Sequence, residues 1–160
     1  MTNLCCEVIN ALSGRTLATA ESCTGGGIGA AITAVSGCSA VYRGGIVSYC
    51  NDIKHSLLDV PEELLVKYGA VSAPVAEAMA VGARKALSSD VAVSATGLAG
   101  PTGDEFGNSV GLVFIGYADR ETVTHRKCFF EGSREEVRQQ AVAAALELIL
   151  VNAISREEKH

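Results

Sequence analysis

A serine in a polar, glycine-rich stretch is the first residue in this sequence that could do chemistry. Ser22 lies in Thr19-Ala-Glu-Ser-Cys-Thr-Gly-Gly26, between a short run of strand type and a run of helix type. A turn of this kind can expose a nucleophile beside the free N–H groups of a helix N-terminus, which hold an anion or an oxyanion. An equally good interpretation of the turn alone is a structural connection in which Ser22 or Thr24 caps the helix.

A serine nucleophile needs a base, and Lys54 is the candidate. The only histidine near a glycine-rich turn is His55, which is adjacent to Lys54. A lysine can accept a proton if burial lowers its pKa, and Lys54 lies between an apolar strand and Leu57-Leu58. A lysine at a helix start is more often a solvated surface residue, and spacing alone does not connect it to Ser22.

Cys23 is an alternative nucleophile, because a thiol at a helix N-terminus can have a lowered pKa. The six cysteines have no C-x-x-C spacing and form no ligand pair with the three histidines. This pattern predicts neither a zinc site nor a disulfide framework. Because no signal peptide is visible, we expect reduced thiols in a cytoplasmic protein.

Length and composition predict a single globular domain over residues 1–160. The chain is 48% hydrophobic and 19% charged, with a net charge of −5. An acidic chain without a long basic run argues against nucleic-acid binding, which requires neutralisation of phosphates. We see no apolar stretch of the roughly 20 residues that span a bilayer, and therefore expect no membrane partner.

Strand-type and helix-type segments alternate along the chain. We expect helices at 3–12, 25–36, 53–58, 61–68, 73–87 and 135–154, and strands at 16–20, 40–50, 90–95, 110–117 and 122–130. This alternation predicts an α/β fold, a three-layer α/β/α domain, in which the hairpin at Asp119-Arg120 makes the central sheet mixed. Asn51 or Asp52 should cap the third helix, Ser133 and Glu136 match the capping box, and residues 154–160 should form a frayed tail.

Three polar clusters would lie where strands end, in the stretches 21–24, 48–54 and 96–104. Two of them are glycine-rich turns, which suggests a ligand at the carboxyl edge of the sheet. Neither turn matches the phosphate loop or the dinucleotide fingerprint. The sequence therefore gives no support for an ATPase or a nicotinamide-cofactor dehydrogenase.

Four motifs occur together and in order: 19–26, Gly44-Gly-Ile-Val-Ser-Tyr49 with Asn51 and Lys54, Gly69-Ala-Val-Ser72, and Thr96-Gly-Leu-Ala-Gly-Pro101. This combination closely resembles the CinA C-terminal domain family, the nicotinamide-nucleotide amidases. The resemblance extends from about Leu4 to Ile154, and the chain looks like the stand-alone form of the domain.

The resemblance implies hydrolysis of the carboxamide of nicotinamide mononucleotide to nicotinate mononucleotide and ammonia, without a metal or cofactor. It implies Ser22 as nucleophile and Lys54 as base, with Ser48 and Tyr49 beside them in the catalytic shell. The expected substrate-binding residues are Glu21, Thr24, Gly25, Gly26, Gly44, Gly45, Asn51, Thr96, Gly97, Ala99, Gly100, Arg134 and Arg138.

The chain departs from the family pattern at Thr102-Gly-Asp-Glu-Phe-Gly107, which is shorter and more acidic and leaves the substrate contacts there open. Two other functions stay open: a nucleotide-binding module without turnover, and a cysteine hydrolase that uses Cys23. A pure binder would not need Ser22 and Lys54 within hydrogen-bond reach. The small-residue helix faces and the frequency of homo-oligomers favour a homodimer or higher homo-oligomer.

Overall fold

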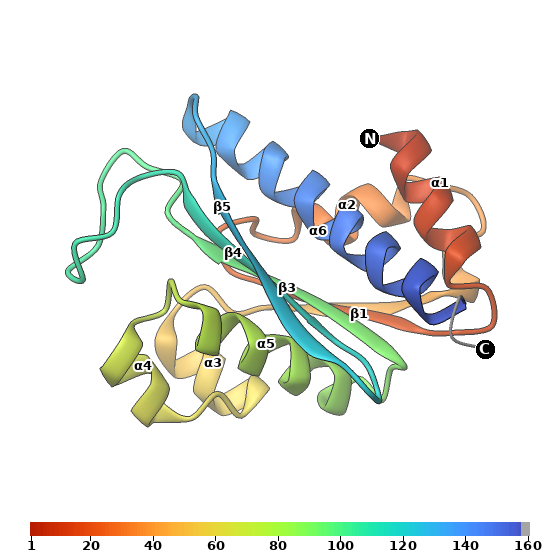
Figure 1. The fold of residues 1–160 in the computed structure, drawn as a ribbon, viewed down its shortest axis with the longest axis horizontal. Coiled ribbons are helices and arrows are strands. Elements are labelled where there is room, and N and C mark those ends of the chain that lie inside the picture. Colours follow the sequence, from red (N-terminus) through yellow and green to blue (C-terminus); the bar gives the residue numbers. More distant parts are fainter. Residues whose placement is uncertain (158–160) are drawn as a thin grey trace.

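A five-stranded mixed sheet forms the centre of the protein in the computed structural model, which describes residues 1–157 (Figure 1). The strands are β1 (Leu17–Glu21), β2 (Tyr42–Val47), β3 (Val91–Gly97), β4 (Leu112–Ala118) and β5 (Val123–Phe129). The helices are α1 (Thr2–Ala11), α2 (Gly27–Thr33), α3 (Asn51–Leu58), α4 (Glu62–Tyr68), α5 (Ala73–Ala86) and α6 (Arg134–Glu157), with a 3-10 turn η1 (Cys38–Ala40).

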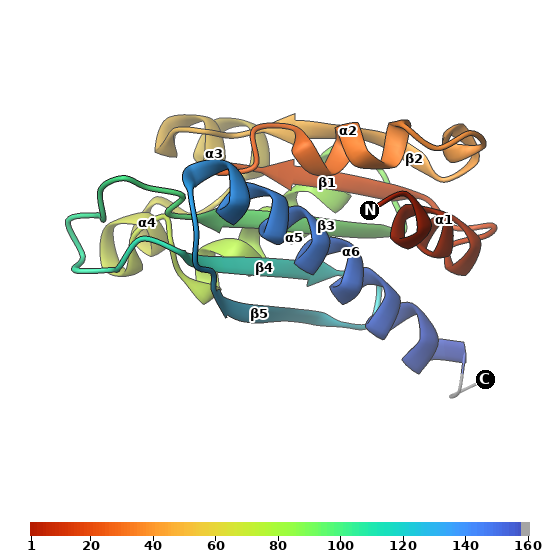
Figure 2. The same ribbon diagram turned by 90° about the horizontal axis from the view of Figure 1, so that it is seen from above.

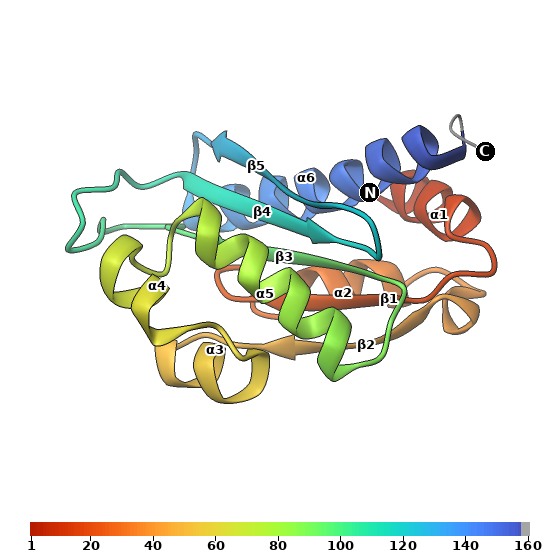
Figure 3. The same cartoon turned by 60° about the horizontal axis from the view of Figure 1, so that its bottom comes forward.

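The helices cover both faces of the sheet, with α1, α2 and α6 on one side and α3, α4 and α5 on the other (Figures 1 and 3). Most residues of β1, β3 and β4 are buried, and apolar side chains fill the space on both faces. This arrangement agrees with the near-continuous apolar composition of these strands. The predicted three-layer α/β/α fold with a mixed sheet is confirmed.

The strand order β2-β1-β3-β4-β5 decides which loops meet. Strands β2, β1 and β3 are parallel, and β4 and β5 form the expected antiparallel hairpin (Figure 2). The carboxyl ends of the three parallel strands therefore share one edge of the sheet. All three polar clusters of the sequence follow these ends.

Several helix boundaries differ from the predicted ones. Helix α2 is shorter than expected, because glycines with positive φ precede it and Gly26 is its N-cap. Helix α3 already begins at Asn51, so its N-cap is Cys50. The capping box is confirmed: the Ser133 N–H donates to the Glu136 carboxylate, and the Glu136 N–H donates to the Ser133 hydroxyl.

The last helix corrects two expectations. Residues 154–157 belong to α6, so the predicted frayed tail is wrong there, while residues 158–160 lie outside the described part. The stretch 134–156 is long and apolar enough to cross a membrane by length and composition, whereas we expected no such stretch from the sequence. Half of the most apolar 18-residue part of this helix is buried inside the protein, where α6 contacts α1, α2, β3 and β4. This is the packing of a core helix.

Candidate active site

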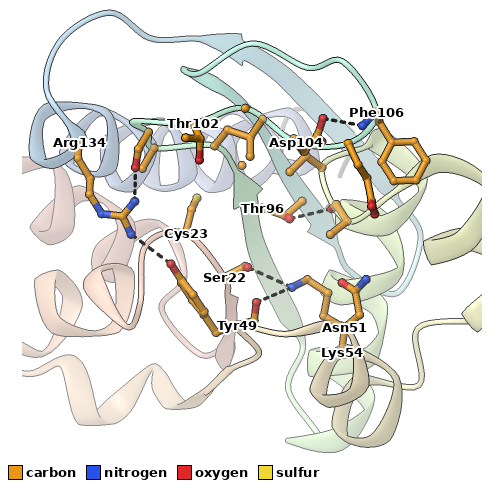
Figure 4. Close-up of a pocket in the computed structure, with 18 residues that line it drawn as sticks. Ser22, Cys23, Tyr49, Asn51, Lys54, Thr96, Thr102, Asp104, Phe106 and Arg134 are labelled. Atoms are coloured by element: carbon orange, nitrogen blue, oxygen red, sulfur yellow. Dashed lines mark hydrogen bonds between the residues drawn. The ribbon is translucent and has the colours of Figure 1, made fainter.

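A cavity of about 330 Å³ lies at the carboxyl edge of the parallel strands (Figure 4). Side chains reach it from the turn after β1, from the β2–α3 segment, from the long β3–β4 loop and from the start of α6. Nine of the predicted site residues line it: Ser22, Tyr49, Asn51, Lys54, Thr96, Gly97, Ala99, Gly100 and Arg134. With Ala70 and Val71 of the Gly69 motif also in the lining, the tertiary structure gathers all four family motifs around one space.

Ser22 and Lys54 form a hydrogen-bonded pair in this cavity. The Lys54 Nζ is 3.1 Å from the Ser22 Oγ, 2.7 Å from the Ser48 carbonyl oxygen and 3.5 Å from the Tyr49 carbonyl oxygen. Lys54 is 1% exposed, and this burial lowers its pKa from 10.5 to about 8. A neutral amine keeps two hydrogens for the carbonyls and a lone pair for the serine proton, as a base requires.

The alternation of side chains along β1 explains why Ser22 meets Lys54. Ala18 and Ala20 pack on the α5 face of the sheet, in the same cluster as Leu58 of α3. Ser22 follows with the same two-residue period, on the face from which α3 delivers Lys54. Its N–H donates to the Ala95 carbonyl of β3, which fixes the backbone at this point.

Glu21 faces the opposite side and has a structural role. Its carboxylate accepts hydrogen bonds from the N–H groups of Ile28 and Gly29, at 2.8 and 3.0 Å, and from the Thr24 hydroxyl at 2.7 Å. A carboxylate at a helix N-terminus satisfies free donors and complements the helix dipole. This position corrects the expectation that the side chains of Glu21 and Thr24 contact the substrate, since the Glu21 carboxylate and the Thr24 hydroxyl are engaged with each other and with α2.

The glycines after Thr24 shape the turn and do not line the cavity. Gly25 and Gly26 have φ values of 58° and 100°, which favour glycine. Arg138 of α6 stabilises the turn, because it donates hydrogen bonds to the carbonyls of Cys23 and Thr24 at 3.1 and 3.2 Å. Gly25, Gly26 and Arg138 lie outside the cavity lining and support the turn that carries Ser22, which corrects the expectation that they contact the substrate.

Gly44 and Gly45 also differ from the expectation. Both lie inside β2, at the level of Ala18 and Thr19 of β1, and away from the carboxyl edge. A Cβ at Gly45 would collide with the Thr19 hydroxyl, so close packing explains this glycine. We correct both from substrate contacts to features of the strand.

Ser48 and Tyr49 support the site in different ways. The Ser48 carbonyl holds Lys54, while the Ser48 hydroxyl is buried, lies outside the cavity lining and has no hydrogen-bond partner among residues 1–157. The Tyr49 hydroxyl accepts a hydrogen bond from the Arg134 Nη2 at 3.1 Å, and the Arg134 Nη1 donates to the Gly100 carbonyl. Arg134 thereby ties the β3–β4 loop to the segment that carries Lys54 (Figure 4).

The β3–β4 loop supplies lining residues that were not among the predicted site residues: Leu98, Thr102, Gly103, Asp104, Glu105 and Phe106. Ala70 and Val71, which follow α4, join them. The Asp104 carboxylate accepts the N–H groups of Phe106 and Asn108, which closes the loop on itself. The Phe106 ring covers Gly69, where a Cβ would collide with it. Gly69 could have indicated this contact from the sequence, since a glycine often marks a position of close packing.

Cys23 lines the cavity, but its thiol resists ionisation. It is 6% exposed, and burial raises the pKa of its thiol to about 11. The expected lowering by a helix N-terminus is absent because α2 begins four residues later, at Gly27. Burial of the thiol argues against a cysteine hydrolase. Across residues 1–157, His, Cys, Asp and Glu side chains form no group of three that could hold a metal ion.

Comparisons with known proteins extend these observations. The model of the CinA C-terminal domain matches residues 3–152. The nicotinamide-nucleotide amidohydrolase PncC of Escherichia coli K12 is 46% identical over 138 residues, which are 85% of this chain and 83% of that protein. A CinA-like protein of Synechococcus sp. (strain CC9311) is 58% identical over 103 residues, which are 64% of this chain and 24% of that protein.

Solved structures of the same superfamily have the same fold. A CinA superfamily protein of Klebsiella pneumoniae superposes with a TM-score of 0.93 at 33% identity, and covers 96% of this chain and 98% of its own. The competence/damage inducible protein CihA of Agrobacterium tumefaciens gives 0.90 at 38% identity, over 94% and 93% of the two chains. This chain spans 24–35% of the length of the first CinA-like relatives it matches. On the match over residues 3–152, the chain belongs to the CinA C-terminal domain family.

Proposed function

We propose that this protein hydrolyses the carboxamide of nicotinamide mononucleotide to nicotinate mononucleotide and ammonia, and so returns the nucleotide to cofactor synthesis. The observation that carries the proposal is the 3.1 Å contact between the Ser22 Oγ and the buried Lys54 Nζ inside a cavity. The 46% identity to a nicotinamide-nucleotide amidohydrolase supports the choice of substrate.

In the proposed mechanism, neutral Lys54 takes the proton of Ser22 while the Ser22 oxygen attacks the carboxamide carbon. The backbone N–H groups of Cys23 and Thr24 take no part in the backbone hydrogen bonds that close the turn within residues 1–157. They are our candidates for the oxyanion donors, each worth about 3 kcal/mol in the transition state. The Lys54 ammonium then protonates the departing nitrogen, which leaves as ammonia and gives an acyl-enzyme ester.

Water completes the cycle. Lys54, neutral again, takes a proton from a water molecule, whose oxygen attacks the ester carbon. The Ser22 oxygen leaves with the proton that Lys54 returns, and the acid product departs. One amide bond and one water molecule are consumed, and one carboxylic acid and one ammonia are formed.

The cavity lining suggests how the nucleotide is held. Arg134 is the guanidinium that lines the cavity, and we propose that it binds the phosphate, together with the loop from Thr96 to Gly100. Asn51 is exposed at the mouth of the cavity and is our candidate for a ribose contact. The carboxylates of Asp104 and Glu105 also line the cavity, where they would favour the positive charge of the pyridinium ring.

Ammonia release from nicotinamide mononucleotide by the purified protein tests the function. Ser22→Ala and Lys54→Arg should each lower kcat by at least about 10³-fold, and the double variant should lose little more, because the two residues act as a unit. Arginine keeps the charge but cannot accept the proton. Substantial ammonia release by Ser22→Ala would contradict the assignment and direct attention to Cys23, which lines the cavity, or to Ser48.

A nucleotide-binding module without turnover is the second candidate. The hydrogen bond between Ser22 and Lys54 disfavours it, because binding alone has no need of a buried lysine beside a serine.

We also propose that residues 1–160 act as one domain, in the cytoplasm and as a homo-oligomer, with no nucleic-acid or membrane partner. All six cysteines are free thiols, which supports a reducing compartment. Light scattering of the protein eluted from a sizing column measures its molar mass. A molar mass equal to that of one chain would contradict the proposed homo-oligomer.

A further inference from the structure

Another cavity, of about 260 Å³, is lined by four arginines and one aspartate. Arg15 precedes β1, Arg84 lies near the end of α5, Arg120 lies in the β4–β5 turn and Arg156 near the end of α6, while Asp90 precedes β3. Figure 2 shows the β4–β5 turn and the end of α6 at the side of the sheet opposite the β3–β4 loop. The cavity therefore lies at the amino edge of β1 and β3, opposite the candidate active site.

The four guanidinium groups concentrate positive charge in an acidic chain, whose net charge is −5 with 13 lysines and arginines in all. Arg15 and Arg156 lie 3.6 and 3.7 Å from the Asp119 carboxylate, and Arg156 lies 3.5 Å from Glu121. Neither Arg84 nor Arg120 has a carboxylate within 4.0 Å among residues 1–157. The four arginines thus carry four positive charges, against the three negative charges of Asp90, Asp119 and Glu121. The net charge around the cavity is +1.

Many of the arginine donors are unused. The Arg15 Nη2 is buried and has no hydrogen-bond partner in the described part of the chain, since 3.6 Å to Asp119 is too long for a hydrogen bond. Arg84 uses its Nε for the Asp90 carbonyl. The Asp90 Oδ2 is itself held by the N–H and hydroxyl of Thr16, at 2.8 and 2.9 Å. An anion in the cavity would satisfy the buried donor and the free guanidinium edges.

We propose that this cavity binds a small phosphate-bearing anion of the size of pyrophosphate or the diphosphate group of a nucleotide. The planar fork of a guanidinium matches two phosphate oxygens at once, and the volume suits such a group. A nucleic acid would need an extended basic surface, whereas these arginines converge on one small cavity. Five residues of β1, at about 3.3 Å each, separate the cavity from Ser22 by roughly 17 Å, so one small ligand cannot occupy both sites.

Titration calorimetry with pyrophosphate in about 100 mM NaCl tests the proposal. The test variant is Arg84→Gln with Arg120→Gln, which leaves Arg15 and Arg156 beside Asp119. Lys67→Gln with Lys127→Gln is the matched control, since it removes the same charge from two exposed side chains elsewhere. We expect saturable binding by the wild type, a Kd at least about tenfold higher in the arginine variant, and a Kd within about twofold in the control.

Three results would overturn the proposal. They are the absence of saturable binding to the wild type, equal weakening in the arginine and lysine variants, and loss of binding in Arg134→Gln, which would place pyrophosphate in the candidate active site. Circular dichroism verifies the fold of each variant. Arg120→Gln alone, in an exposed turn, provides the same comparison if the double arginine variant does not fold.

Discussion

Replacing Lys54 by methionine should abolish turnover and yet stabilise the fold at neutral pH. Lys54 is 1% exposed, and burial lowers its pKa from 10.5 to about 8. Each pKa unit corresponds to about 1.36 kcal/mol between the two protonation states. The ionised amine therefore costs the folded state roughly 3 kcal/mol of unfolding free energy at pH values below 8.

The stability that Lys54→Met gains by removing the buried charge is partly offset by lost hydrogen bonds. Methionine cannot donate to the carbonyls of Ser48 and Tyr49, and each lost hydrogen bond is worth about 1 kcal/mol. The methionine side chain keeps most of the buried volume, so the cost of repacking is small. The net gain should be about 1 kcal/mol, which corresponds to a Tm increase of about 2–4 °C for a domain of this size.

The pH dependence separates this cause from a simple packing effect. In the unfolded chain Lys54 titrates near about 10.4, whereas in the folded protein its pKa is about 8. Between these values the unfolded state binds more protons, so the stability of the wild type rises with pH. The advantage of Lys54→Met should thus be largest below pH 8 and should shrink as the pH rises toward about 10.4.

Urea unfolding at several pH values measures the effect, with ammonia release as the activity assay. Ser22→Ala is the matched control, because it removes the proposed nucleophile but leaves the buried amine, and it should show no gain in stability. A Lys54→Met variant that is less stable than the wild type at every pH would refute the reasoning that burial of the ammonium is costly.

Three further predictions follow from the site. The rate of ammonia release should rise with pH through an apparent pKa near the value of about 8 for Lys54, because only the neutral amine accepts the serine proton; a flat profile between pH 6 and 9 would contradict it. Cys23→Ala should keep most of its activity, and the wild-type thiol should resist alkylation at pH 7 by mass spectrometry, since burial raises the pKa of this thiol to about 11. Glu21→Gln should lower the unfolding free energy by about 2 kcal/mol, because a charged cap of the α2 N-terminus is lost; an unchanged thermal melt would contradict the capping role.

Local sequence patterns determined the elements of the fold. The apolar runs that became β1 and β3, and the Ser133–Glu136 capping box, depend on neighbours a few residues apart, so the chain alone reveals them. The position of Ser22 directly after a buried strand has the same origin. The four motifs in order were specific enough to indicate the family, which the match over residues 3–152 confirms.

The tertiary structure decided which side chains meet. Ser22 and Lys54 are 32 residues apart, and only the placement of β2 beside β1 brings the loops that carry them together. Glu21 and Ser22 had to face opposite sides of the sheet, since side chains alternate along a strand. That α2 covers one side and α3 the other is a long-range outcome. It makes Glu21 a helix cap and places Ser22 beside Lys54. The lowered pKa of Lys54 likewise depends on burial, which no local pattern of residues determines.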